Sequence, residues 1–454
     1  MLWRAHWVNN MNTPVCDFVR NYINSDVLRM HMPGHKGNNF LGFERFDITE
    51  IKGADSLYEA DGIIAESEAN ASALFGCRTI YSTEGSSQCI RAMLQLISIY
   101  AKQQGKKAVI AAGRNAHKSF LTAVALLDVE VEWIYPKNTD SYLSCALTAE
   151  ELEEYFKQTQ EMPTAVYLTS PDYLGIIADI QSIAEVCHRY GILLAVDNAH
   201  GPYLKFLPES MHPIELGADI CCDSAHKTLP VLTGGAYLHL SAHMQETVGA
   251  QAKNAMMLFA STSPSYLILQ SLDAANIYMV DYSDRLQSMI AEIKNLKKRL
   301  SQHGYFLYGN EPLKLTVCPK GYGYTGNQLA DLLRQNKIEP EFSDPDFLVL
   351  MFSAETDRAM LAYIEQVFCK IPARLPICEK SPAFVQGKKI LTIREAMLSK
   401  SELLPVKFCL GKILAVPSVS CPPAVPILVC GEEIDEHAIS CFSYYGIKEC
   451  CVVI

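Results

Sequence analysis

The chain has 454 residues, 49% of them apolar, and a formal net charge of -11. The length and apolar content exclude a disordered or fibrous protein and suit an α/β protein of two or three lobes, and the acidic balance argues against a nucleic-acid partner. Sixteen scattered cysteines with no CxxC pair predict reduced thiols, a cytoplasmic location and no metal site. The sequence predicts no secretion signal and no membrane span.

Residues 1–75 are predicted to form an N-terminal arm rather than a domain. The arm contains a short amphipathic helix at 16–24, a glycine- and proline-rich segment HMPGHKG at 31–37, and a helix at 63–75.

Residues 76–303 are predicted to form a large domain. Strand patterns at 108–112, 129–135, 165–169, 192–196 and 219–222 alternate with helical patterns. Such alternation is typical of βαβ units and a mostly parallel sheet. A long helix is predicted over 266–303, with a solvated basic face.

Residues 304–454 are predicted to form a smaller α+β domain. Short strands at 313–317 and 347–352 alternate with helices, and a proline-rich link at 371–382 leads to a terminal module from about residue 383. The whole chain therefore has the pattern of an α/β fold with a large parallel-sheet domain and a smaller C-terminal domain.

One lysine and one acid follow two of the predicted strands of the large domain. Lys227 lies in DSAHKTLP after the strand at 219–222, and Asp197 follows the strand at 192–196. If these strands are parallel neighbours, both side chains lie at the sheet edge where open α/β sheets bind ligands. This pair suits pyridoxal 5'-phosphate (PLP), because a lysine forms an imine with its aldehyde and an acid holds its ring nitrogen protonated.

Other polar residues supply the remaining parts of a PLP site. Ser86 and Ser87 precede an apolar helix at 90–100, so their hydroxyls and the first N–H groups of the helix can bind a phosphate; the alternative is an ordinary helix cap. His117, after the strand at 108–112, is placed to stack on the ring, although a loop histidine can simply be solvated. Ser224 is a further phosphate donor, and His226 is placed to guide the substrate carboxylate or protons.

Seven segments give the chain a resemblance to a known family. They are HMPGHKG at 31–37, DITEIKGADSLYEADGIIAESE at 47–68, RNAHKS at 114–119, DNAHGPY at 197–203, SAHKTLP at 224–230, STSPSY at 261–266 and PPAVPILVCGE at 422–432. With them the chain resembles the Orn/Lys/Arg decarboxylases, in the short form without an amino-terminal wing domain. The resemblance implies a fold-type-I PLP-dependent transferase fold.

The resemblance also implies residue roles. Lys227 matches the Schiff-base lysine, Asp197 the partner of the ring nitrogen and His117 the stacking histidine. It makes Ser86, Ser87 and Ser224 the phosphate donors, and His200 and His226 pocket residues. Ser261 and Thr262 match a segment that reaches the cofactor of a neighbouring subunit, which implies a homodimer with the active site at its interface.

The implied activity is decarboxylation of arginine, lysine or ornithine, which releases CO2 and an amine of polyamine biosynthesis. An aminotransferase or another PLP lyase is the nearest alternative, because Lys227 and Asp197 specify only the cofactor; a noncatalytic binding protein is a more distant one. The role of Glu84 and the acid that recognises the substrate tail stay open. The candidates for that acid are Asp55, Glu59, Asp61, Glu432 and Glu433.

Overall fold

The computed structural model describes residues 11–137, 141–383, 386–417 and 423–454. The chain divides into two compact units, Met1–Ala108 with Cys187–Leu286, and Val109–Val186 with Gln287–Ile454. The division into an arm, a large domain and a small domain stays a prediction. Two segments used above, the amino-terminal stretch and PPAVPILVCGE, lie partly outside the described residues, because residues 1–10 and Pro422 do.

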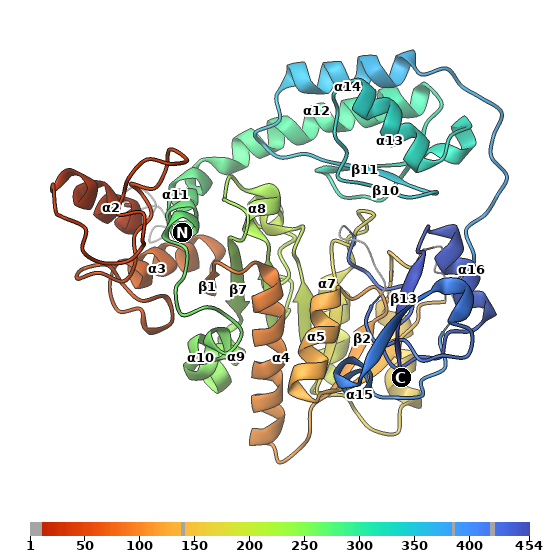
Figure 1. Ribbon diagram of the computed structural model, residues 1–454, viewed down its shortest axis with the longest axis horizontal. Helices are drawn as coiled ribbons and strands as arrows, with labels where there is room; N and C mark the ends of the chain where they lie inside the picture. The colour runs from red at the N-terminus through yellow and green to blue at the C-terminus, as the bar shows by residue number, and fades with distance from the viewer. Residues whose placement is uncertain (1–10, 138–140, 384–385, 418–422) are drawn as a thin grey trace. The chain divides into compact units, whose positions relative to one another are not determined.

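The main sheet has seven strands in the order β1-β7-β6-β5-β4-β2-β3 (Figure 1). Strands β2 and β3, β2 and β4, and β5 and β6 pair in parallel, whereas β7 is antiparallel to β1 and β6. The predicted α/β fold with a mostly parallel sheet is therefore confirmed. The strands are β1 (Arg78–Ser82), β2 (Val109–Gly113), β3 (Glu130–Ile134), β4 (Ala165–Thr169), β5 (Leu193–Asp197), β6 (Ile220–Asp223) and β7 (Ala236–Leu240).

The five predicted strands of this sheet are β2 to β6, and each end lies within one residue of the prediction. Every residue of β2, β5 and β6 is buried, so these strands appear in the sequence as continuous apolar runs. Strands β1 and β7 were not predicted. The first begins with an arginine, and the second carries a histidine in its interior, so neither has a continuous apolar run.

Helix α3 (Ile63–Phe75), the predicted second helix of the arm, begins and ends where the sequence predicted. Helix α3 starts after Gly62 and ends at Gly76, whose φ of 75° is a left-handed conformation that glycine adopts without strain. Helix α4 starts at Ser86, so the predicted phosphate-binding serines form its first turn. The helices are α2 (Pro14–Asn24), α3 (Ile63–Phe75), α4 (Ser86–Gln103), α8 (Ala225–Thr228), α9 (Ala242–Val248), α10 (Ala252–Met257) and α11 (Tyr266–Val280), with α7 (Ile180–Arg189) and α12 (Tyr282–Gln302) reaching into the second unit.

The single long helix predicted over 266–303 is wrong. Two helices, α11 and α12, meet at Asp281, whose φ of -108° and ψ of 21° depart from helical values. Aspartate is a poor interior helix residue because its side chain competes for nearby backbone groups, and here it separates a mostly apolar helix from an amphipathic one.

The second unit contains two small antiparallel sheets in addition to its share of the main sheet. One has the order β10-β11-β9-β8, and the other pairs β12 with β13. Among the described helices, none is long and apolar enough to cross a membrane. The elements are α5 (Lys118–Leu127), α6 (Ala149–Gln158), β8 (Phe306–Tyr308), β9 (Lys314–Cys318), α13 (Gly326–Gln335), β10 (Phe342–Ser343), β11 (Leu348–Met351), α14 (Arg358–Lys370), α15 (Ile393–Leu398), β12 (Ser401–Pro405), α16 (Glu436–Tyr444) and β13 (Glu449–Val453).

Candidate active site

Lys227 and His200 contact each other in the first unit. Lys227 lies in α8, which follows β6, and His200 lies in the loop after β5. The Lys227 Nζ is 2.7 Å from the His200 Nε2, and the His200 side chain is buried. An imidazole nitrogen at this distance can accept a proton from an ammonium group, so the pair is able to present a neutral amine.

Asp197 supplies a buried carboxylate beside this pair of segments. It is the last residue of β5, is 2% exposed, and its Oδ1 accepts the backbone N–H of Ala199 at 3.2 Å. Strands β5 and β6 are parallel neighbours, with Asp197 in register with Cys222. The expectation that the acid and the lysine follow neighbouring parallel strands is therefore confirmed.

Two of the predicted phosphate donors are hydrogen bonded to each other. The hydroxyl of Ser224, which precedes α8, donates to the Ser86 Oγ at 2.7 Å. Ser86 and Ser87 open α4, whose first N–H groups have no acceptor within the helix. The two hydroxyls and this helix start form a donor set that suits an anion.

His226, the residue before the lysine, is fixed by the turn that precedes β7. Its Nδ1 is 3.0 Å from the Gly235 carbonyl oxygen. A carbonyl oxygen only accepts, so the ring proton of neutral His226 lies on Nδ1, which leaves Nε2 as an acceptor.

The roles of two other predicted residues are not tested by the structure. His117 belongs to the second unit, where it precedes α5 and its Nδ1 accepts the backbone N–H of Ser119 at 3.1 Å. Thr262, with Ser261, is exposed in the loop before α11 of the first unit. Their roles in stacking on a ring and in reaching a neighbouring subunit stay predictions.

Comparison with known proteins decides the family. The model of the Orn/Lys/Arg decarboxylase major domain matches residues 13–319. The chain belongs to the Orn/Lys/Arg decarboxylase family. The predicted family and the predicted enzyme class, an amino-acid decarboxylase, are therefore confirmed.

Individual relatives cover nearly the whole chain. The arginine decarboxylase of Bacillus subtilis (strain 168) is 28% identical over 468 residues, which cover 94% of this chain and 92% of the relative. The arginine decarboxylase of Halalkalibacterium halodurans is 29% identical over 476 residues, with the same two coverages. The lysine decarboxylase of Francisella novicida has a TM-score of 0.79 at 18% identity, covering 98% of this chain and 82% of that chain, which confirms the predicted fold.

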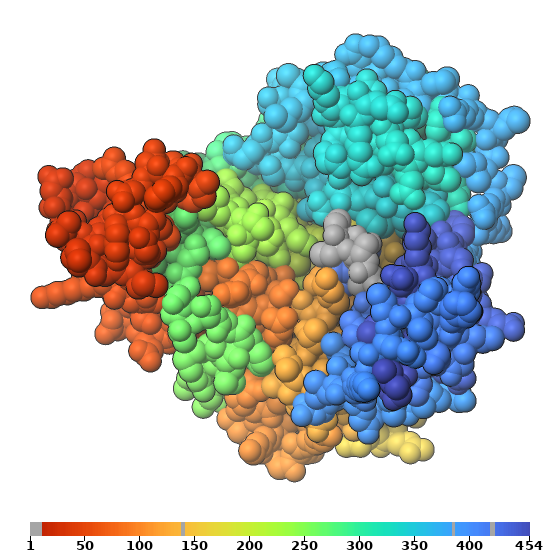
Figure 2. Space-filling view, viewed as in Figure 1, coloured from red at the N-terminus to blue at the C-terminus, as the bar shows by residue number. Residues whose placement is uncertain are grey.

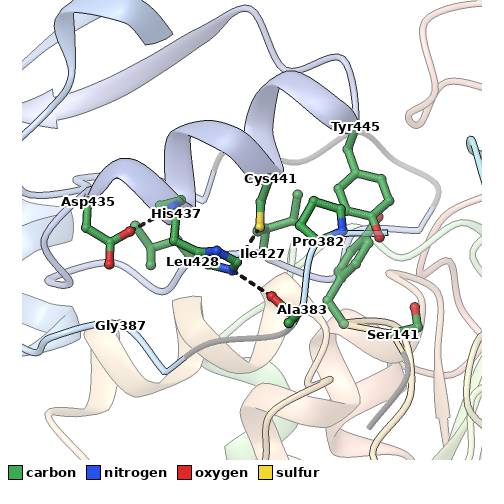
Figure 3. Close-up of a pocket in the computed structure, with 12 residues that line it drawn as sticks. Ser141, Pro382, Ala383, Gly387, Ile427, Leu428, Asp435, His437, Cys441 and Tyr445 are labelled. Atoms are coloured by element: carbon green, nitrogen blue, oxygen red, sulfur yellow. Dashed lines mark hydrogen bonds between the residues drawn. The ribbon is translucent and has the colours of Figure 1, made fainter. Parts of the chain in front are cut away.

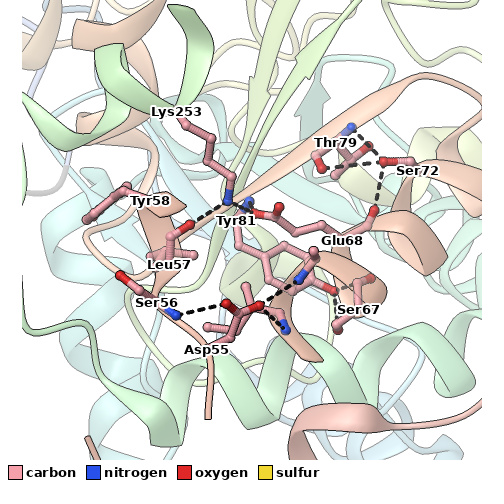
Figure 4. Close-up of polar contacts among 12 residues, drawn as sticks. Asp55, Ser56, Leu57, Tyr58, Ser67, Glu68, Ser72, Thr79, Tyr81 and Lys253 are labelled. Atoms are coloured by element: carbon pink, nitrogen blue, oxygen red, sulfur yellow. Dashed lines mark hydrogen bonds and ion pairs between the residues drawn. The ribbon is translucent and has the colours of Figure 1, made fainter. Parts of the chain in front are cut away.

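Asp55, a candidate for recognising the substrate tail, binds backbone groups in this structure. Its buried carboxylate accepts five backbone N–H groups at 2.9–3.3 Å, those of Ser56, Asp61, Gly62, Ile64 and Ala65 (Figure 4). The last two residues belong to the first turn of α3, where N–H groups lack acceptors within the helix. Asp55 therefore fixes the segment before α3 to the first turn of that helix.

Lys253 adds a second connection to the same part of the arm. Its Nζ lies 2.6 Å from both the Glu68 Oε1 and the Leu57 carbonyl oxygen, and the same Glu68 oxygen accepts the Tyr81 N–H at 2.9 Å (Figure 4). The buried Glu68 carboxylate of α3 thereby joins β1 to Lys253 of α10, and Lys253 in turn holds the segment before α3 at Leu57.

The other acidic candidates differ in exposure. Glu59 and Asp61 are exposed, and Glu433 pairs with Lys388 at 3.2 Å. Glu84, whose role stayed open in the sequence, is exposed as well. Glu432, in contrast, is 4% exposed and lies within the second unit.

Sequence reasoning missed a buried cluster around Asp223, the last residue of β6. Asp223, His212 and His239 are fully buried, and each histidine Nε2 lies 3.2–3.3 Å from the Asp223 Oδ2. Asn198 donates to the Asp223 Oδ1 at 2.7 Å. Burial alone would raise the pKa of Asp223, but the charge interactions with the two histidines hold it well below its ordinary value. Asp223 could have been found from the sequence, because it ends a strand directly before SAHKTLP. His212 and His239 could not, because their positions follow no spacing pattern.

A separate pocket lies in the second unit (Figure 3). It is lined mainly by apolar and aromatic side chains, together with His437 and Cys441 of α16. The His437 Nε2 is 2.6 Å from the Ala383 carbonyl oxygen and 3.4 Å from the Cys441 Sγ. Burial raises the pKa of the Cys441 thiol, so this cysteine is not activated as a nucleophile.

Proposed function

We propose that the protein is a PLP-dependent decarboxylase of a basic amino acid, with arginine as its substrate. The observation that carries the proposal is the arrangement of Lys227, His200 and Asp197 after the parallel neighbours β5 and β6. Similarity to two arginine decarboxylases over 94% of the chain supports arginine over lysine and ornithine.

The side chains of the first unit fit the cofactor group by group. Lys227 offers an amine for the aldehyde, and Asp197 offers a buried carboxylate for the ring nitrogen. Ser86, Ser87 and Ser224, with the start of α4, offer donors for the phosphate. When bound, PLP supplies an aldehyde and an electron-withdrawing ring that takes up the electrons released as CO2 leaves.

The remaining chemistry belongs to the chain. Decarboxylation replaces the substrate carboxylate with a proton on the same carbon, so the site must hold a proton and deliver it after CO2 has left. The contact between the Lys227 Nζ and the His200 Nε2 is able to hold that proton. Which bond breaks depends on the orientation in which the pocket holds the substrate.

The proposal includes a homodimer with the active site at its interface. In the arm, eight large apolar side chains are exposed, and large exposed apolar patches mark interaction surfaces; Figure 2 shows the N-terminal segment, in red, at the surface. They are Val27, Leu28, Met30, Met32, Phe40, Leu41, Phe43 and Phe46. The exposed Ser261 and Thr262 support a role across that interface.

A cytoplasmic location also belongs to the proposal. Its support is the state of the cysteines, since the fifteen within the described residues are all free.

The test is product analysis by mass spectrometry. Purified protein loaded with PLP is incubated with equimolar arginine, lysine and ornithine, with Lys227→Ala as the inactive variant and Lys102→Ala, an exposed lysine of α4, as the matched control. We expect agmatine as the main product, made by the wild type and the control variant and not by Lys227→Ala. Cadaverine or putrescine would change the substrate, and keto acids formed only with an added amino acceptor would make the protein an aminotransferase.

A further inference from the structure

Gln88 is a buried polar residue in the first turn of α4, directly after the two serines proposed to bind the phosphate. Its side chain is 0% exposed, whereas those two serines are half-buried. Its Nε2 lies 2.8 Å from the Met256 carbonyl oxygen and 3.0 Å from the Tyr58 hydroxyl, and its Oε1 lies 2.5 Å from the Ser82 hydroxyl. The amide therefore uses both of its N–H donors and its carbonyl oxygen within the first unit.

The chemistry of these partners fixes the orientation of the Gln88 amide. A carbonyl oxygen only accepts, so the amide atom that faces Met256 is the NH2 group. The Tyr58 hydroxyl then accepts the second N–H, and the Ser82 hydroxyl donates to Oε1. The four groups thus form one network in which every donor and acceptor is assigned.

The loop between β1 and α4 is held by this network and by a neighbouring turn. Ser82, the last residue of β1, donates to Gln88 and accepts the Glu84 N–H at 3.1 Å. The Gly85 N–H donates to the Gly234 carbonyl oxygen at 2.7 Å, and Gly85 has a φ of 73°, which glycine adopts without strain. The chain that leads to the phosphate donors is therefore fixed at both of these loop residues.

Tyr58 connects the network to the segment before α3. It lies in the short 3-10 helix Leu57–Glu59, and Lys253 of α10 donates to the carbonyl oxygen of the first residue of that helix at 2.6 Å (Figure 4). Met256, which accepts from Gln88, also belongs to α10. The two partners of the Gln88 Nε2 are thus attached to each other as well as to α4.

We infer that Gln88 and Tyr58 are positioning residues for the cofactor phosphate. The inference rests on the proposed function, in which Ser86, Ser87 and the start of α4 bind that phosphate. Three contacts of one buried amide determine where the first turn of α4 lies relative to β1, α10 and the segment before α3. Because Gln88 is fully buried and its polar atoms are paired within the protein, it acts on the phosphate through the serines and does not touch it.

A positioning role of this kind predicts an effect that depends on the phosphate group. PLP and pyridoxal share the aldehyde and the ring, for which Lys227 and Asp197 are the proposed partners, and differ in the phosphate. Displaced phosphate donors should therefore weaken the binding of PLP and leave the binding of pyridoxal unchanged. A general loosening of the first unit should instead weaken the binding of both compounds.

Two pairs of variants separate these explanations. Tyr58→Phe removes the hydroxyl that accepts from Gln88, and Tyr266→Phe is its control, because the Tyr266 hydroxyl also holds the segment before α3, at the Asp55 carbonyl oxygen. Gln88→Met removes all three hydrogen bonds at similar volume. Gln270→Met is its control, because the Gln270 Nε2 donates to two carbonyl oxygens of the same unit at 2.9 and 2.8 Å. Tyr58→Phe loses a single hydroxyl and stays informative if Gln88→Met does not fold.

The test measures the dissociation constants of PLP and pyridoxal, the competition of inorganic phosphate with PLP, and the thermal midpoint without cofactor. We expect Tyr58→Phe to weaken PLP binding about three- to tenfold, the effect of one hydrogen bond, and Gln88→Met about 10- to 100-fold, with pyridoxal binding within about twofold of wild type. The phosphate concentration that competes with PLP should rise by the same factors. Adding Tyr58→Phe to Gln88→Met should cause no further loss, because the hydroxyl acts through that amide. Both control variants should change the thermal midpoint alone.

The inference is overturned if Tyr58→Phe and Gln88→Met weaken PLP and pyridoxal binding by the same factor, or if they lower the thermal midpoint and change neither affinity. A wild type that binds PLP and decarboxylates none of the three amino acids would refute the proposed activity alone, because the ratio of the PLP and pyridoxal affinities still decides the inference. A wild type that binds no PLP would overturn both.

Discussion

The buried contact of His212 with Asp223 tests whether burial or distance decides the contribution of a histidine–carboxylate pair. The His212 Nε2 is 3.3 Å from the Asp223 Oδ2, with both side chains 0% exposed. The His188 Nε2 is closer to the Asp219 Oδ2, at 3.0 Å, but that imidazole is 48% exposed. Exposed pairs contribute about 0–1 kcal/mol, whereas removing one partner of a buried pair costs about 3–5 kcal/mol, because the other charge stays buried.

We therefore expect His212→Ala to lower the unfolding free energy by about 4 kcal/mol or more, and His188→Ala by less than about 1 kcal/mol. Part of the first loss is packing, since the His212 ring contacts Phe75 with ring centroids 5.5 Å apart. His212→Gln keeps an N–H donor for Asp223 and most of the volume, so it should lose less than His212→Ala. Thermal and urea unfolding of the protein without cofactor compare the three variants.

The pH dependence gives a second readout. Because the pKa of Asp223 in the folded protein lies well below its ordinary value, this carboxylate contributes stability above about pH 4 and loses it as the pH falls further. His212→Ala removes one cause of the lowered pKa, so the difference from wild type should shrink below pH 4. Equal losses in His212→Ala and His188→Ala, or a difference that grows with acid, would refute the reasoning.

Three further predictions concern other buried groups. Burial raises the pKa of Asp344 from 3.8 to about 7, so the wild type should lose stability as the pH rises across that window, by about 1.4 kcal/mol for each pH unit; Asp344→Asn should remove this loss in thermal unfolding at pH 5 and pH 8. Gly201→Ala places a Cβ 2.0 Å from the Asn198 Oδ1, so we expect a loss of about 1–3 kcal/mol and lower PLP content, measured by unfolding and by absorbance. Asp55→Ala removes the acceptor of five N–H groups and should cost more than about 2 kcal/mol, while KM for arginine at a permissive temperature stays unchanged; a raised KM would make Asp55 a substrate ligand.

The sequence predicted the strands that are buried on both faces, because such strands appear as apolar runs between polar loops. Strand β4 was predicted at both ends, whereas β7 was missed because it carries His239 among its buried residues. A histidine in a strand becomes compatible with burial only through its partners, here Asp223 and Thr79, and neither is adjacent in the sequence. The break between α11 and α12 was missed because both halves keep a helical period.

The site residues that could be predicted from the sequence are those that directly follow a predicted strand. Asp197 and Lys227 each follow a predicted strand, and the expected parallel pairing holds for β5 and β6, although only a short 3-10 helix at Pro202–Phe206 lies between them. The contact of Lys227 with His200 was not predictable, since it depends on how the loop after β5 turns back toward α8. The burial of Glu432 was likewise hidden, because its Oε2 lies 3.6 Å from the Nη2 of the buried Arg114, which is more than 300 residues earlier in the chain.

The buried cluster and the candidate site share one loop, and this links stability to cofactor binding. Asn198 donates its side-chain N–H to Asp223 and its backbone N–H to the Cys222 carbonyl oxygen, at 2.7 and 3.0 Å. Its neighbours in the chain are Asp197, the proposed partner of the cofactor ring nitrogen, and, two residues on, His200. Through Asn198, the buried Asp223 carboxylate therefore holds the loop that carries Asp197 and His200. A variant such as His212→Ala should then lose PLP affinity as well as stability, whereas His188→Ala should keep its PLP affinity and lose less than about 1 kcal/mol of stability.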